Sequence, residues 1–278
     1  MNKLFTVIIA IILFLAIIGV YSNYSKSPSS GPSGSLNIAG STTILPLNQE
    51  WARLLMEKYP DLRISVSGGG SGNGIKSVGL EIIDIGATSR DIKDKEFKEY
   101  PDLELVAVAK DSVAVVVHPS NPLSDIKMKD IAKIYAGEIT NFKDLGGPDI
   151  AITVYSREEG SGTRSAFEDI VLKKFDVEIF SKALIKSSNG ELRAAVSGNN
   201  QGITYLSMGY LDNSIKVLSI DGVEPTMENV KSGDYTVVRS LYLITKGEPS
   251  ELEGLFIEFA LSPEGQIIVD EQEYITVG

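Results

Sequence analysis

The chain has 278 residues, a formal net charge of −11, a charged fraction of 23% and a hydrophobic fraction of 43%. This acidic balance excludes nucleic acid as a partner, because a nucleic-acid binder needs a basic face that neutralises phosphates. It does not exclude a small anion, which backbone N–H groups and one arginine can hold in a site shielded from solvent. Cysteine is absent, which excludes disulfide bonds, a thiolate nucleophile and a lipid anchor on cysteine.

The N-terminus begins with an apolar run from Leu4 to Tyr21 that carries no charge and follows Lys3. Residues 1–21 are therefore predicted to be a signal or anchor segment. We expect an uncleaved membrane anchor in preference to a cleaved signal peptide, because the run is long and no small-x-small cleavage site follows it. Residues 22–35 are rich in Ser, Pro and Gly and predict a flexible tether. The folded part is expected outside the cytoplasm, at the cell surface or in the periplasm.

Strands and helices are predicted to alternate from residue 36 onward. Strands are expected at 36–40, 62–68 and 83–88, and helices around Trp51 to Leu55 and Ile75 to Leu80. Such alternation is typical of an α/β fold with a mainly parallel sheet and helices on both faces. About 240 residues follow the N-terminal segment, which suits two modest lobes.

The second half of the chain begins after a long apolar strand around Val106 to Val117. Helices are then expected at Met128–Tyr135, Arg164–Phe175, Glu191–Val196 and 253–261, and strands at 151–156, 202–207 and 236–245. We predict a discontinuous first lobe of residues 36–115 and 238–278, and an inserted second lobe of residues 116–237. Both crossings would then lie in apolar strands, which is a hinge architecture with the ligand between the lobes.

Three loops rich in Gly, Ser and Thr precede predicted helices. The first, Gly40 to Thr43, offers hydroxyls and helix-start N–H groups that can meet an anion, although ordinary helix capping would also explain it. The second contains Ser71 between glycines. It lacks the P-loop order because Ile75 separates the last glycine from Lys76, and a flexible turn is the alternative reading.

The third loop combines an arginine with a helix start. A strand delivers Arg157, and 160–163, of sequence Gly-Ser-Gly-Thr, opens the next helix. The guanidinium can grip two oxygens of an oxyanion while Ser161, Gly162 and Thr163 donate N–H and O–H groups. Arg157 is expected to be the only formal positive charge in contact with the ligand. A surface cluster of ion pairs with the neighbouring glutamates is the alternative.

The chain resembles the phosphate-binding proteins of phosphate ABC importers, which have a periplasmic-binding-protein-like fold of two lobes. The resemblance rests on collinear motifs at 40–43, 68–76, 84–90, 157–164, 187–210 and 240–245. It implies a non-enzymatic solute-binding protein, monomeric, that delivers inorganic phosphate to ABC permease subunits and needs no cofactor. It also implies a set of phosphate ligands: Thr42, Thr43, Ser71, Arg157, Ser161, Gly162 and Thr163.

One position departs from the family pattern. Ser89 occupies the place where well-studied members carry an aspartate that accepts a proton from phosphate. A hydroxyl can both donate and accept, so Ser89 is still expected to bind phosphate. Selectivity against sulfate is in doubt unless Asp91 substitutes. Arg90 is expected to pair with Asp91, and a contact with the anion is the alternative.

Catalysis has few candidate groups in this sequence. His118 is the only histidine and precedes Pro119 at the end of an apolar strand, so a conventional multi-histidine metal site is not expected, and no GxSxG elbow accompanies it. The alternatives that remain are a binding protein for another tetrahedral oxyanion, an anchored phosphate-ester hydrolase that uses the same cradle, and an extracellular sensor or adhesion domain.

Overall fold

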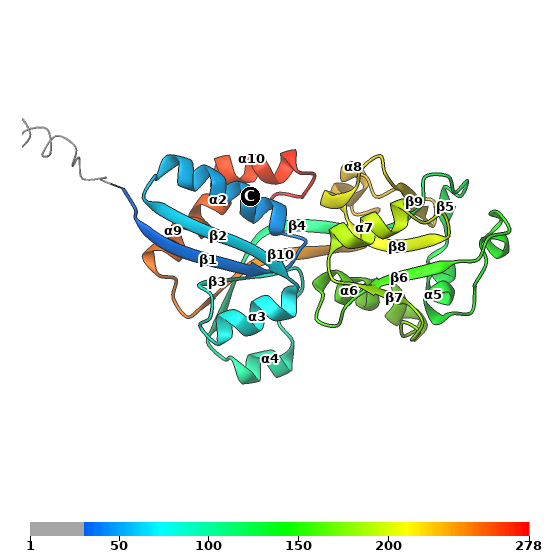
Figure 1. Cartoon of the computed structure of the whole chain (residues 1–278), viewed down its shortest axis with the longest axis horizontal. Helices are drawn as coiled ribbons and strands as arrows, with labels where there is room; N and C mark the ends of the chain where they lie inside the picture. The colour runs from blue at the N-terminus through cyan, green and yellow to red at the C-terminus, as the bar shows by residue number, and fades with distance from the viewer. Residues whose placement is uncertain (1–30, 278) are drawn as a thin grey trace, which may run out of the picture.

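The computed structural model describes residues 31–277, which form two lobes side by side (Figure 1). The predicted anchor at 1–21 and most of the predicted tether lie outside these residues. The first strand begins at Gly34, slightly before the predicted start of the fold. None of the helices between residues 31 and 277 is both long enough and apolar enough to span a membrane.

The first lobe is a parallel βαβ arrangement, as the alternation predicts. Its elements are β1 (Gly34–Gly40), α2 (Leu45–Lys58), β2 (Leu62–Gly69), α3 (Ser71–Gly79), β3 (Ile85–Thr88), α4 (Asp94–Glu99), α9 (Glu251–Leu261) and α10 (Pro263–Glu271). Strand β1 pairs in parallel with both β2 and β3. Helix α4 was not predicted, and it buries none of its residues, so its sequence has no apolar stripe that would reveal a helix.

The second lobe repeats the parallel arrangement with different helices. Its elements are β5 (Asp125–Ile126), α5 (Met128–Ala136), β6 (Thr153–Arg157), α6 (Gly162–Phe167), β7 (Leu184–Lys186), α7 (Asn189–Ser197), β8 (Gly202–Ser207), β9 (Lys216–Ile220) and α8 (Met227–Ser232). Strand β6 pairs in parallel with β7 and β8. The helix predicted at 164–175 is present but changes type, because α6 continues as a π-helix at Glu168–Leu172 and a 3-10 turn at Lys173–Phe175.

Two long strands, β4 (Leu103–Val117) and β10 (Val238–Lys246), run from one lobe into the other (Figure 1). They pair with each other in antiparallel fashion, and the far half of β4 continues into the second lobe beside β8 and β9. The sheet order β2-β1-β3-β10-β4-β8-β6-β7 is therefore continuous. The sheet is parallel among β1, β2 and β3 and among β6, β7 and β8, whereas the crossing strands β4 and β10 pair antiparallel with each other and with β3, β8 and β9. The predicted lobe boundaries remain a prediction.

Each lobe has its own hydrophobic core, and the two meet along β4. On β4, Val108 and Ala109 belong to the cluster of Trp51 and Phe256 in the first lobe, whereas Val113, Val115 and Val117 belong to the cluster of Phe167 in the second. Separate cores linked by two strands allow each lobe to behave as a unit, so relative motion of the lobes is the natural expectation.

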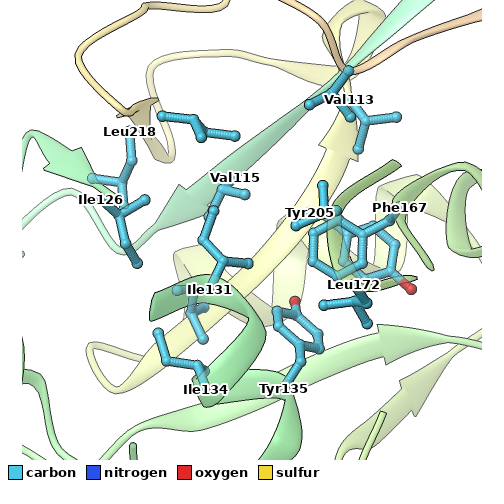
Figure 2. Packing of buried hydrophobic residues seen from close by; sticks show 14 of the residues in the cluster. Val113, Val115, Ile126, Ile131, Ile134, Tyr135, Phe167, Leu172, Tyr205 and Leu218 are labelled. Carbon is cyan, nitrogen blue, oxygen red and sulfur yellow. The ribbon is translucent and has the colours of Figure 1, made fainter. Parts of the chain in front are cut away.

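The second core also positions the site. Figure 2 shows Tyr205 and Phe167 packed face to face, with ring centroids 4.1 Å apart and an interplanar angle of 14°, beside Tyr135. The Tyr205 hydroxyl hydrogen-bonds to Ser156 Oγ at 2.8 Å and accepts from the Arg157 backbone N–H at 3.2 Å. The buried Tyr205 hydroxyl thus fixes the C-terminal end of β6, whose last residue is the predicted ligand Arg157.

Candidate functional site

The first loop is held by a close approach between two strands. Gly40 ends β1 with φ +140°, and a Cβ at this position would collide with the Ala87 carbonyl of β3. Only glycine can adopt this conformation at such a contact without strain. The Ser41 backbone N–H donates to the same carbonyl at 2.8 Å. Thr42 and Thr43 are consequently presented, buried, just before α2.

The carbonyls of this loop are anchored by two tyrosines. The Tyr210 hydroxyl donates to the Thr42 carbonyl at 2.5 Å, and the Tyr274 hydroxyl donates to the Thr43 carbonyl at 2.7 Å. Burial raises the pKa of Tyr210 to about 12, so this phenol stays neutral and keeps its donor proton at physiological pH. Since Tyr210 follows β8 of the second lobe, this contact crosses between the lobes.

Ser71 and Ser89 complete the contribution of the first lobe. Ser71 is the first residue of α3, Ser89 follows β3, and both are fully buried. The Ser89 backbone N–H donates to Ser71 Oγ at 3.1 Å, and Ser41 Oγ donates to Ser89 Oγ at 2.9 Å. Three hydroxyls from three different loops therefore converge on one point.

The second lobe contributes Arg157, whose side chain is only 1% exposed. Its Nε and Nη2 donate to the two carboxylate oxygens of Glu158, each at 2.8 Å, and Nη2 also donates to the Ser187 carbonyl at 3.2 Å. The predicted alternative of an ion pair with a neighbouring glutamate is thus present, but it is not a surface pair, because the guanidinium is buried. The carboxylate orients the guanidinium by a bidentate contact.

The start of α6 follows Arg157 closely in the chain and is the second contribution of this lobe to the site. Ser161 is the N-cap residue, and its hydroxyl accepts from the Arg164 backbone N–H at 3.3 Å. Gly162 and Thr163 form the first turn and are buried. A Cβ on Gly162 would collide with Ser89 Oγ and come to 2.5 Å from Ser71 Oγ. The absence of a side chain at Gly162 is what allows the two lobes to approach here.

The facing edges of the lobes make direct polar contacts. The hydroxyls of Thr43 and Thr163 lie 3.1 Å apart, and the Gly72 backbone N–H donates to the Gly160 carbonyl at 2.9 Å. The structure thus brings the predicted residues to one buried interlobe surface: Thr42, Thr43, Ser71, Ser89, Arg157, Ser161, Gly162 and Thr163.

Several residues of this cluster were not predicted. Asn189, the first residue of α7, donates from Nδ2 to Thr43 Oγ1 at 3.1 Å. Arg239 of β10 donates to Asp111 of β4 at 2.6 Å and to Thr43 Oγ1 at 2.9 Å. Asn189 falls within the motif at 187–210, which signals its neighbourhood but not its role. The pair of Arg239 and Asp111 has no local signal, because it depends on the register of two strands that are remote in sequence.

One expectation on charge was wrong, and another stays a prediction. Arg157 remains the predicted sole cation in contact with the ligand, although Arg239 also reaches the cluster through Thr43 Oγ1. Arg90 does not pair with the Asp91 carboxylate: its guanidinium binds both carboxylate oxygens of Glu96 at 2.7 and 2.8 Å, and it reaches only the backbone carbonyl of Asp91. The unpredicted helix α4 brings Glu96 back over Arg90, and the Asp91 carboxylate accepts instead from the Tyr242 hydroxyl at 2.9 Å.

The buried pair of Asp111 and Arg239 is electrostatically unusual. Burial raises the pKa of Asp111, although Arg239 and the Ser207 hydroxyl, which donates to it at 2.8 Å, oppose this shift. Burial also lowers the pKa of Arg239, but an arginine remains protonated in proteins. The pair is therefore a charged element in the middle of the cluster and not a surface ion pair.

An open cavity of about 460 Å³ lies beside the cluster. It is lined on the first-lobe side by Ser89 and Arg90, on the second-lobe side by Ser165 and Ala166, and on the crossing strand by Arg239. Ser89 and Arg239 thus belong both to the buried cluster and to the cavity wall. Between residues 31 and 277, no group of three or more His, Asp or Glu side chains is arranged to hold a metal ion.

The fold and the site together define a class of protein. Two α/β lobes joined by crossing strands, with hydroxyls, amides and arginines of both lobes meeting in a buried cluster, are the architecture of two-lobe solute-binding proteins, which close around a ligand. Comparison with known proteins agrees with this class, since residues 25–264 match the family model of the PBP superfamily domain.

The chain belongs to the family of PstS phosphate-binding proteins. It is 34% identical to the phosphate-binding protein PstS of Bacillus subtilis over 88% of this chain and 81% of that relative. PstS of Borreliella burgdorferi is 29% identical over 87% of this chain and 90% of its own length. Among solved structures, one described as a phosphate ABC transporter substrate-binding protein with bound phosphate, from Clostridium perfringens, has 38% identity and a TM-score of 0.83, covering 88% of this chain and 100% of its own.

Proposed function

We propose that this chain captures inorganic phosphate between its two lobes and delivers it to the permease of an ABC importer. The observation that carries the proposal is the convergence of hydroxyls from both lobes beside a buried, pre-oriented arginine: Thr43 meets Thr163 at 3.1 Å, and Gly162 lies against Ser89. The family membership supports the same ligand, because the Bacillus subtilis relative is a phosphate-binding protein by name and the Clostridium perfringens structure is described with bound phosphate.

The proposed ligands are the residues that the resemblance nominates: Thr42, Thr43, Ser71, Ser89, Arg157, Ser161, Gly162 and Thr163. Glu158 occupies Nε and Nη2 of Arg157, which leaves the Nη1 end of the guanidinium for an anion oxygen. Hydroxyl groups that now bond to each other can turn to donate to the anion. Charge-assisted hydrogen bonds of this kind are worth about 1.5–3 kcal/mol each before the costs of association.

Capture follows from the division of the donors between the lobes. Each lobe alone offers only part of the set, so an open form is expected to bind weakly. A phosphate that bridges both lobes stabilises the closed form by its differential affinity. The closed shape is then the form that the permease recognises, and the chain acts as a monomer outside the cytoplasm, tethered by the N-terminal segment.

The decisive experiment is calorimetric titration of the purified protein with phosphate, sulfate, arsenate and molybdate, compared with Arg157→Ala. We expect submicromolar phosphate affinity and a loss of about a thousandfold in the variant, equivalent to about 4 kcal/mol. The bound anion then lacks the buried guanidinium, and the half-buried Glu158 carboxylate beside it is left without its partner. Arg53→Ala is the matched control, since Arg53 pairs with Glu50 on the exposed face of α2. Unchanged affinity in Arg157→Ala would place the site elsewhere.

We infer that the chain binds phosphate and does not catalyse a reaction of phosphate or its esters. An anchored phosphate-ester hydrolase, the alternative in another class, would need a metal cluster or an activated nucleophile beside the anion. Release of product from a chromogenic phosphate ester by the purified protein, with or without divalent metals, would favour the hydrolase. For the alternative of a sensor, the expected finding is a signalling partner that responds to the phosphate-loaded protein.

A further inference from the structure

Arg239 is a buried cation with unused donor capacity. Only 8% of the residue is exposed, and its Nη1 has no hydrogen-bond partner among residues 31–277. The rest of the guanidinium is occupied, since Nε and Nη2 donate to Asp111 Oδ2 at 2.9 and 2.6 Å. A buried donor without a partner is costly, and in native proteins it calls for an explanation such as a ligand.

The surroundings of Arg239 are those of the proposed phosphate site. Its Nη2 donates at 2.9 Å to Thr43 Oγ1, the same atom that meets Thr163 at 3.1 Å and accepts from Asn189 at 3.1 Å. Arg239 also lines the interlobe cavity together with Ser89. Arg239 is therefore bonded directly to a first-lobe hydroxyl and linked through it to a second-lobe hydroxyl, and it is not part of an isolated ion pair.

The carboxylates near the site are already engaged. Asp111 accepts from Arg239 on Oδ2 and from Ser207 on Oδ1. Glu158 accepts from Arg157 on both oxygens. The remaining side chains in the cluster are hydroxyls and one amide, which can donate. Two further carboxylates, Asp91 and Asp169, line the adjoining cavity, where Asp91 accepts from the Tyr242 hydroxyl at 2.9 Å. A buried cluster with two guanidiniums, in which both carboxylates are already paired, favours an anion that has no proton to give away.

We propose that Arg239 is a second ligand-binding arginine, positioned by Asp111, and that it makes the site select the doubly charged form of a tetrahedral oxyanion. This inference rests on the proposed function and names the ionic form that the same site takes. It extends the binding set to the crossing strand β10, so the anion contacts both lobes and the hinge between them. Sulfate, a permanent dianion of the same shape, is expected to compete with phosphate.

The experiment measures the pH profile of affinity by calorimetry with phosphate and with sulfate. Phosphate gains its second charge near neutral pH, whereas sulfate keeps two charges throughout, so sulfate reports any titration of the protein itself. The charged and titratable side chains around Arg239 are Asp111, Arg157 and Tyr274. Those that share the cavity wall with Arg239 are Arg90, Asp91, Lys93, Asp169 and Tyr242. The sulfate profile accounts for all of them. In the wild-type protein we expect phosphate affinity, relative to sulfate, to rise as the dianion forms.

The variants are Arg239→Gln, Arg239→Lys and the double variant Asp111→Asn with Arg239→Gln. The double variant removes both charges and keeps a neutral hydrogen-bonding pair, so it covers the case in which Arg239→Gln fails to fold. In the glutamine variants we expect phosphate and sulfate affinity to fall roughly ten- to hundredfold at pH 8, with a smaller fall for monoanionic phosphate at pH 5.5. Arg239→Lys should recover part of the loss because it restores the charge. Arg53→Gln on α2 is the control.

The outcomes separate the two proposals. Wild-type protein that binds no phosphate would overturn the proposed function itself. Phosphate binding that is unchanged in the glutamine variants, or weakened equally at pH 5.5 and pH 8 with no recovery in Arg239→Lys, would overturn the role of Arg239 alone. Failure of sulfate to bind wild-type protein would overturn selection of the dianion.

Discussion

At the scale of single residues, the site depends on small side chains at positions of close contact. Gly40 lets β1 lie against the Ala87 carbonyl, and Gly162 lets α6 approach Ser89 and Ser71 of the other lobe. A methyl group at Gly40 would collide with backbone atoms, and one at Gly162 would collide with buried hydroxyls. Neither neighbour is the free end of a flexible side chain that could simply turn away. The glycines thus set how closely the two halves of the proposed phosphate site can come together.

Gly162→Ala is expected to weaken phosphate binding by at least tenfold. Its Cβ would occupy the space of Ser89 Oγ, so full closure would require the lobes to separate slightly and lose interlobe hydrogen bonds of about 1 kcal/mol each. Calorimetric titration measures the affinity. Gly254→Ala is the control, because Gly254 lies in α9 with no atom within 4 Å of the added Cβ. Equal affinities for the two variants would contradict the close-contact argument.

At the scale of elements, helix α4 explains where Arg90 finds its partner. The guanidinium of Arg90 binds Glu96, whose carboxylate also accepts from the Lys93 backbone N–H at 2.9 Å. Burial acts to raise the pKa of Glu96, but Arg90 and the backbone N–H of Lys93 outweigh burial and hold this pKa below its ordinary value. The pair ties α4 to the loop that carries Ser89, and so supports the site from behind.

The contribution of Glu96 to stability is expected to depend on pH. A carboxyl group with a depressed folded pKa stabilises the protein above its unfolded pKa of about 4.3, and this stability is lost as pH falls through the folded pKa. Denaturant unfolding of wild-type protein and Glu96→Gln should therefore differ most at pH 7, and the difference should shrink below about pH 4. A difference that grows on acidification would show that Glu96 does not act through this ion pair.

At the scale of the whole molecule, the lobes meet through polar groups. The interlobe contacts include Thr43 with Thr163, Tyr210 with the Thr42 carbonyl, and Gly72 with the Gly160 carbonyl. Each such bond is worth only about 0.5–1.5 kcal/mol net, so closure is sensitive to a charged ligand that takes over these donors. Strands β4 and β10 join the strands of both lobes into one sheet.

Phosphate is expected to raise the thermal stability of the protein through this closure. At a free concentration one hundred times Kd, a ligand that binds only the native state adds about 2.7 kcal/mol, which corresponds to a Tm increase of roughly 5–10 °C for a chain of this size. Scanning calorimetry with phosphate, compared with chloride at equal ionic strength, measures the shift. The same shift in chloride would indicate a general salt effect and no specific capture.

Local sequence patterns determined the alternating strands and helices and the long strand at the crossing. They also determined the three loops that carry the proposed ligands other than Ser89. Hydrophobic periodicity and glycine-rich helix starts are both properties of short segments, which is why the sequence alone contains them. They did not determine α4, which buries no side chain. Only the tertiary structure decided that Asp111 meets Arg239, 128 residues away, and that Asn189 meets Thr43, 146 residues away. Such partners are set by strand register and by the packing of one lobe on the other, and no short stretch of sequence encodes either.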